Sequence, residues 1–113
     1  MADALDSTLT LRLREVLASG DTTESDLREL TDEVGTQVRL LRGQLRGSEQ
    51  RLRALNADPA SPIADIADEL RRAEALRPRL REARELSRLL DERARELRTA
   101  WLLRQAGARR ATS

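Results

Sequence analysis

The stretch NADPASP at residues 56–62 decides how this chain folds. A residue that precedes proline is pushed away from helical backbone angles, and the stretch contains two such positions, before Pro59 and Pro62. Long segments with a helical pattern of apolar residues lie on both sides of it. A loop this short between two long helices favours an antiparallel arrangement. The stretch therefore predicts the turn of a helical hairpin.

The segment before the turn, residues 24–55, has the pattern of a long amphipathic helix. Thr23 and Asp26 have the spacing of a capping box, which marks a helix start. Apolar residues then recur at steps of three and four, with one gap at Ser48. They span 28 residues, or four heptads, which is typical of coiled-coil-like packing. The series is Leu27, Leu30, Val34, Val38, Leu41, Leu45, Leu52 and Leu55.

The segment after the turn, residues 62–106, predicts a second long helix with a mean apolar step of about 3.5 residues. The step from Ile63 to Leu76 is 13 residues where two heptads need 14, so the pattern slips by one residue beside Pro78. A proline inside a helix removes one hydrogen bond, and we expect a kink or a break near Pro78. The series is Ile63, Ile66, Leu70, Ala73, Leu76, Leu80, Ala83, Leu86, Leu90, Ala94, Leu97 and Trp101.

The N-terminal segment, residues 3–18, predicts a shorter helix. Leu5, Leu9, Leu13, Val16 and Leu17 recur at helical spacing, although polar and apolar residues alternate over 7–13 and leave a short strand as an alternative. The expected fold class is all-α: an antiparallel coiled-coil-like helical hairpin with a shorter N-terminal helix, which makes a three-helix bundle. We expect residues 1–106 to form a single helical domain. Residues 107–113, from Gly107 onward, are expected to form a flexible basic tail.

The composition excludes most catalytic chemistry. All 21 basic residues are Arg, and the chain of 113 residues has no Lys, His, Cys, Tyr or Phe. Thiolate and imidazole metal sites, Ser–His and Cys–His catalysis and Schiff-base lysines therefore cannot be built. We expect no cofactor, no metal and no enzymatic activity. One enzyme class survives, the small helical chorismate mutases with Arg clamps, but such a site normally needs a Lys as well.

No targeting segment is expected. The N-terminus is acidic and has no basic region followed by an apolar stretch, so it does not match a signal peptide. The longest apolar run is residues 100–103, far short of the roughly 20 residues that cross a bilayer. We expect a cytoplasmic protein without membrane contact.

The charges occur in blocks although the total is only +1. The net charge is −5 over residues 21–38, +4 over 39–56, −4 over 57–70 and +4 over 71–81. In an antiparallel hairpin the basic end of the first long helix faces the acidic start of the second. The acidic block 21–38 is a candidate partner for basic residues of a second copy.

The expected function is protein–protein interaction, as a scaffold, adaptor or assembly component that associates with another protein or with itself. Adjacent apolar residues widen the apolar face of the third helix at its C-terminal end. One neighbouring helix cannot cover that width, so we expect a docking surface there. Trp101 is the only aromatic residue; it is either a core anchor or an exposed hot spot of the kind enriched in Trp. The candidate docking residues are Leu89, Leu90, Leu97, Trp101, Leu102 and Leu103.

Nucleic-acid binding is the alternative function. Arg is the preferred contact for phosphate and guanine, and basic ridges are conceivable on the long helices. The near-balance of acids and bases and the absence of stacking aromatics argue against it. The residues that would carry it are Arg71, Arg72, Arg77, Arg79, Arg81, Arg104, Arg109 and Arg110.

Overall fold

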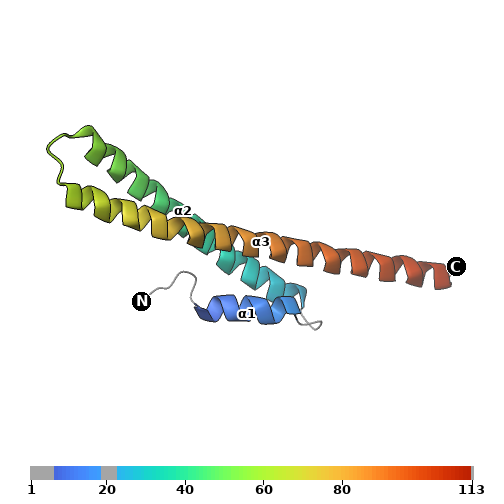
Figure 1. The fold of residues 1–113 in the computed structure, drawn as a ribbon. Helices are drawn as coiled ribbons and strands as arrows, with labels where there is room; N and C mark the ends of the chain where they lie inside the picture. The colour runs from blue at the N-terminus through green and yellow to red at the C-terminus, as the bar shows by residue number, and fades with distance from the viewer. Residues whose placement is uncertain (1–6, 19–22, 113) are drawn as a thin grey trace.

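The structure, a computed structural model, describes residues 7–18 and 23–112. It contains three helices: α1 (Ser7–Ala18), α2 (Glu24–Ala57) and α3 (Ile63–Thr112). α2 and α3 pack against each other as a long antiparallel hairpin, and α1 lies at the end of the hairpin away from the turn (Figure 1). No strand occurs in the described ranges. The expected all-α class and the hairpin with a shorter N-terminal helix are confirmed.

The turn lies where the prolines predict it. The backbone N–H of Asp58 donates to the carbonyl of Leu55 at 3.3 Å and closes α2. The Asp58 carboxylate then accepts from the N–H of Ala60 at 2.9 Å. The Pro62 carbonyl accepts from the N–H of Ile66 at 3.3 Å, so α3 begins at Ile63, one residue later than expected.

The start of α2 is held by the predicted capping box. The N–H of Asp26 donates to the Thr23 hydroxyl at 3.1 Å, and the N–H of Thr23 donates to the Asp26 carboxylate at 3.3 Å. Two N–H groups that lack helical partners are thereby satisfied. The acidic first turn also suits the positive end of the helix dipole.

One apolar core runs along the contact between the helices. Its members are Leu9, Leu13, Leu27, Leu30, Val34, Leu41, Leu76, Leu80, Ala83, Leu86 and Leu90. Val16, Leu17, Val38, Leu45, Ala94 and Leu97 pack against it and are partly buried. We call the line along which α3 faces α2 the seam.

The register of the seam differs from the predicted apolar series at three points: Ile63 is 83% exposed, Glu69 takes the place of Leu70, and heptad spacing passes through Ser87 beside the buried Leu86. Glu69 is buried, with 4% of its surface exposed, whereas Leu70 is 43% exposed. With Glu69 in place of Leu70, heptad spacing continues through Pro78 without the predicted slip. The seam then follows two heptad positions: 66, 73, 80, 87, 94 and 101, and 69, 76, 83, 90, 97 and 104. The apparent slip arose because the apolar series included Leu70, whereas the heptad position is occupied by the polar residue Glu69.

α3 is not broken at Pro78. The proline lies inside the continuous helix and is exposed to solvent. Its ring removes one backbone hydrogen bond. The seam residues Leu76 and Leu80 on either side are both buried in the core, and this packing favours a continuous helix across the proline.

The expected end of the third helix near residue 106 is also wrong. α3 continues through Gly107 to Thr112, so residues 107–112 are helical. Gly107 costs about 1 kcal/mol relative to Ala in a helix interior. The favourable helix formers around it and the basic last turn with Arg109 and Arg110, which suits the negative end of the helix dipole, offset that cost.

α1 packs against the hairpin through one apolar face. Leu9 and Leu13 are buried in the shared core, and Arg12 forms an ion pair with Glu33 of α2 at 3.5 Å. The expected helix over 3–18 is confirmed from Ser7 to Ala18, while residues 3–6 lie outside the described residues.

Candidate functional site

The structure divides the six candidate docking residues into two groups. Leu90 is fully buried, and Leu89 and Leu97 are half-buried. Trp101, Leu102 and Leu103 are 53%, 55% and 68% exposed. The first group belongs to the folded core or its margin, and only the second group is available to a partner. Of the two roles considered for Trp101, the structure favours the exposed one.

The exposed group lies on a part of α3 that extends beyond α2. α3 has 50 residues and α2 has 34, so about 16 residues, or roughly 24 Å, have no counterpart on α2. We call residues 98–112 the arm. In Figure 1 the arm projects away from both other helices toward the C-terminus. All arm side chains from residue 98 to residue 110 are exposed.

Four consecutive apolar residues form a belt around the arm. Each residue of a helix is rotated by about 100° from the one before it. Ala100, Trp101, Leu102 and Leu103 therefore surround the axis and leave no polar side on this turn. We call these four residues the belt. A helix that is hydrophobic all round is ordinarily buried. The exposed belt is therefore the part of the surface that most clearly lacks a covering neighbour among the described residues.

A groove lies at the base of the arm, beside the start of α2. It is lined by Glu24, Ala94, Leu97, Arg98, Trp101 and Arg104. Ala94 and Leu97, two of its lining residues, are the last seam residues that pack on the core. Trp101 occupies the next seam position, so the groove is the point at which α3 still presents the seam and α2 has ended.

The arm and the start of α2 carry opposite charges. The arm contains Arg98, Arg104, Arg109 and Arg110, and no Asp or Glu occurs after residue 96. Residues 24–33, which we call the acidic start, contain five carboxylates and a single Arg. The two regions meet at the groove, whose lining includes Glu24 from the acidic start and Arg98 and Arg104 from the arm.

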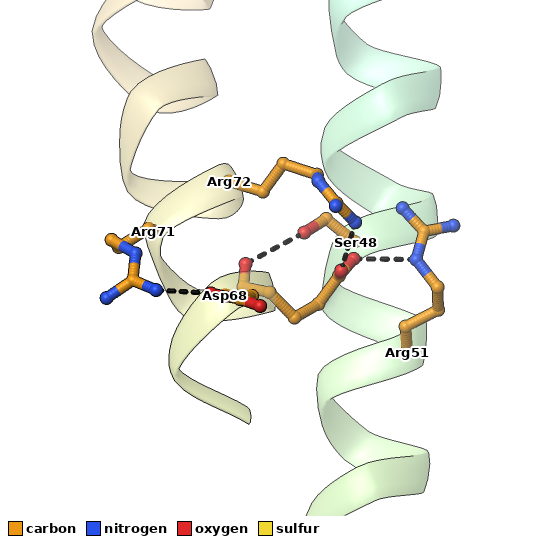
Figure 2. Close-up of polar contacts among 6 residues, drawn as sticks. Ser48, Arg51, Asp68, Arg71 and Arg72 are labelled. Atoms are coloured by element: carbon orange, nitrogen blue, oxygen red, sulfur yellow. Dashed lines mark hydrogen bonds and ion pairs between the residues drawn. The ribbon is translucent and has the colours of Figure 1, made fainter. Parts of the chain in front are cut away.

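A second feature, a polar cluster around a buried carboxylate, lies in the seam near the turn (Figure 2). Arg51 Nε donates to the Glu69 carboxylate at 2.6 Å, and Arg72 donates to its other oxygen at 2.6 Å. The Ser48 hydroxyl donates to the main-chain carbonyl of Glu69 at 3.2 Å. Figure 2 shows Ser48 and Arg51 reaching across from α2 toward α3. We call Ser48, Arg51, Glu69 and Arg72 the seam cluster.

The seam cluster lowers the pKa of the Glu69 carboxylate. Burial by itself would raise the pKa of Glu69, but hydrogen bonds and positive charge from Arg51 and Arg72 lower that pKa below its ordinary value of 4.5. Glu69 is therefore charged at neutral pH. The sequence signals for this cluster were the gap at Ser48 and the one-residue slip, neither of which named Glu69.

The eight arginines of the nucleic-acid alternative do not come together on one face. Arg71 and Arg72 bind Asp68 and Glu69 on their own helix. Arg77 and Arg81 are exposed, and Arg79 is half-buried. Arg104, Arg109 and Arg110 lie on the arm, and at least 23 residues, or roughly 35 Å, separate them from the first group.

Two further features do not occur in the described residues. No group of three or more carboxylates that could hold a metal ion occurs among them. No helix in the described ranges combines the length and apolar character needed to cross a membrane.

Comparisons of the chain with models of protein families, with curated proteins and with solved structures found no match.

Proposed function

We propose that this chain is a non-enzymatic protein–protein interaction module that binds its partner through the belt of the arm. The observation that carries the proposal is the exposure of Trp101, Leu102 and Leu103 on a helical turn without a polar side. Burial of apolar surface contributes about 25 cal/mol per Å². A partner that covers this turn removes its apolar surface from water, and that burial stabilises the complex.

The rest of the fold supports this role by holding the arm in place. The helical hairpin anchors α3 through a continuous seam as far as Leu97, and the arm continues the same helix. A binding element that is already helical loses less conformational entropy on association. The hairpin and α1 therefore serve as the scaffold, and the arm serves as the binding element.

Nucleic-acid binding is the weaker candidate. It draws support from the four arginines of the arm, which occur there without any acid. It draws none from Arg71 and Arg72, which bind carboxylates of their own helix. Electrostatic binding of this kind falls steeply with salt, whereas burial of the belt does not.

The experiment that tests the proposal is affinity capture from lysate of the source organism, with mass spectrometry of the bound proteins. The bait is the full chain, and a variant carries Trp101→Ala, Leu102→Ala and Leu103→Ala. We expect at least one protein, this chain included, to bind the unaltered bait at moderate salt and to be lost from the variant. Nuclease treatment keeps bridging nucleic acid out of the comparison.

The matched control for this capture carries Leu11→Ala and Leu40→Ala, which shorten two exposed leucines outside the arm. We expect this control to capture the same proteins as the unaltered chain. If the arm variant captures the same set as the control, the belt is not the binding surface and the proposal is overturned.

A further inference from the structure

We infer that the partner of the belt is a second copy of this chain, with the two arms antiparallel. The arms cross at their belts, and the basic tip of each arm lies beside the acidic start of α2 in the other copy. The inference rests on the proposed function and names its partner. Three observations carry it: the continuity of the seam, the distribution of charge and the position of the groove.

The seam continues past the point where α2 ends. α2 runs antiparallel to α3 and covers the seam positions up to Leu97. The next two seam positions are Trp101 and Arg104, and both line the groove. An antiparallel arm from a second copy crosses this face at Trp101 with the same chain direction as α2, and its tip then passes alongside the first turns of α2, which already cover the seam up to Leu97. The second copy thus extends a contact that the fold already makes.

The charges select the antiparallel arrangement of the arms. Parallel arms would place Arg104, Arg109 and Arg110 beside the same residues of the other copy. In antiparallel arms with the belts level, residues 104–110 of one arm lie at the level of residues 93–99 of the other. That is the level at which Glu24 borders the groove, where the acidic start of α2 begins. Charge complementarity of this kind sets orientation and suppresses wrong pairings.

This arrangement is closed and symmetric. Each copy contributes the same two surfaces, its own arm and its own acidic start, as in the common two-fold dimer. Trp101 faces the partner along the seam direction, with Ala100 and Leu102 beside it. Leu103 lies about 200° from Trp101 around the helix, so its contribution to the contact is smaller than that of Trp101.

The first test measures association of the purified full chain by sedimentation across a concentration series. Trp101 is the only aromatic residue, so its fluorescence reports directly on burial of the belt. We expect a monomer–dimer equilibrium and a blue shift of the emission that follows the dimer fraction. Trp101→Ala is expected to raise the dissociation constant by about tenfold or more. Leu11→Ala and Leu40→Ala, at exposed leucines outside the arm, are expected to change it by less than about threefold.

The second test reverses the two charged surfaces separately. One variant carries Arg104→Glu and Arg109→Glu on the arm, and another carries Glu24→Arg and Glu29→Arg on the acidic start. Each variant alone is expected to dimerise at least about tenfold more weakly. An equimolar mixture of the two is expected to regain the affinity of the unaltered chain, because each arm then meets an opposite charge. Glu74→Arg with Glu82→Arg is the control for a change of net charge elsewhere, and circular dichroism confirms that every variant remains helical.

Three results would overturn the inference. The first is a monomer at every concentration. The second is a dimer whose Trp101 emission does not shift. The third is an acidic-start variant that dimerises as well as the unaltered chain, which would place the arms in another arrangement. A monomer that nevertheless captures another protein through the belt would refute the second copy and leave the proposed function standing.

Discussion

Glu69 is a charged residue at a buried position of the seam. It occupies a seam position that heptad spacing would assign to an apolar residue, and it is satisfied by Arg51 from across the seam and by Arg72 from its own helix. Replacing a buried ion pair by apolar residues is often neutral for stability, whereas removing one partner is strongly destabilising. A polar residue at a seam position is best attested as a device that fixes register. We assign that role to the seam cluster.

The pKa of Glu69 makes the stability of the hairpin depend on pH. The pKa is lowered in the folded protein, so its contribution is present above the ordinary value of 4.5 and is lost as the pH falls through the folded value. We expect Glu69→Gln to lower the unfolding temperature by several degrees at pH 7. The difference from the unaltered chain should shrink steadily below about pH 4.5. Thermal unfolding followed by circular dichroism at pH 3 to 7 measures it.

The control for this titration is Glu74→Gln, because Glu74 is an exposed carboxylate on the same helix. The pKa of Glu85 is also lowered, through a hydrogen bond and charge from Arg88. Glu85 titrates in both the variant and the unaltered chain, so its effect cancels in the difference. A gap between Glu69→Gln and the unaltered chain that is the same at pH 3 and pH 7 would contradict the assigned role of the carboxylate.

At the scale of the element, α3 shows how a helix keeps one register across unfavourable residues. Pro78 and Gly107 both weaken a helix in isolation. α3 nevertheless continues from Ile63 to Thr112. Its heptad positions stay in line because the seam takes Glu69 rather than Leu70. At Pro78, tertiary packing of the seam thus outweighs the local preference of a single residue.

The register of α3 predicts losses of very different size for two similar substitutions. Leu76 is buried at a seam position, and we expect Leu76→Ala to lower the free energy of unfolding by about 2–5 kcal/mol. Leu70 lies outside the seam, and Leu70→Ala should cost only about 0.5 kcal/mol. Chemical denaturation monitored by circular dichroism gives both values. Equal losses for the two variants would restore the register of the apolar series and refute the one described above.

At the scale of the whole molecule, the chain is a rod with one unsupported end. Its extents are 79 × 25 × 15 Å and its radius of gyration is 20.8 Å, whereas a compact domain of this length has a radius of gyration of about 13 Å. α1 widens the rod beside the acidic start of α2, through Leu9 and Leu13. The arm beyond Leu97 adds length without adding core. The molecule therefore consists of a stable body and a projecting helix.

Separation of body and arm predicts the effect of truncation. A chain that ends at Arg98 keeps every residue of the core and of its margin. We expect its free energy of unfolding to stay within about 1 kcal/mol of that of the full chain under conditions where both are monomeric. Urea denaturation compares the two. A loss of several kcal/mol would show that the arm supports the body and is not a separate binding element.

The sequence by itself determined the helices, the turn and the class of fold. Helical spacing, the capping residues Thr23 and Asp26, and the prolines of residues 56–62 are local signals, and each acts through backbone geometry within a few residues of itself. The tertiary structure alone decided which of Glu69 and Leu70 enters the seam and that Pro78 does not break α3. It also decided that Leu90 is core while Trp101 is exposed. Those outcomes depend on where α2 lies along α3. Burial requires two surfaces in contact, and the apolar pattern of one helix does not show where the other helix packs against it.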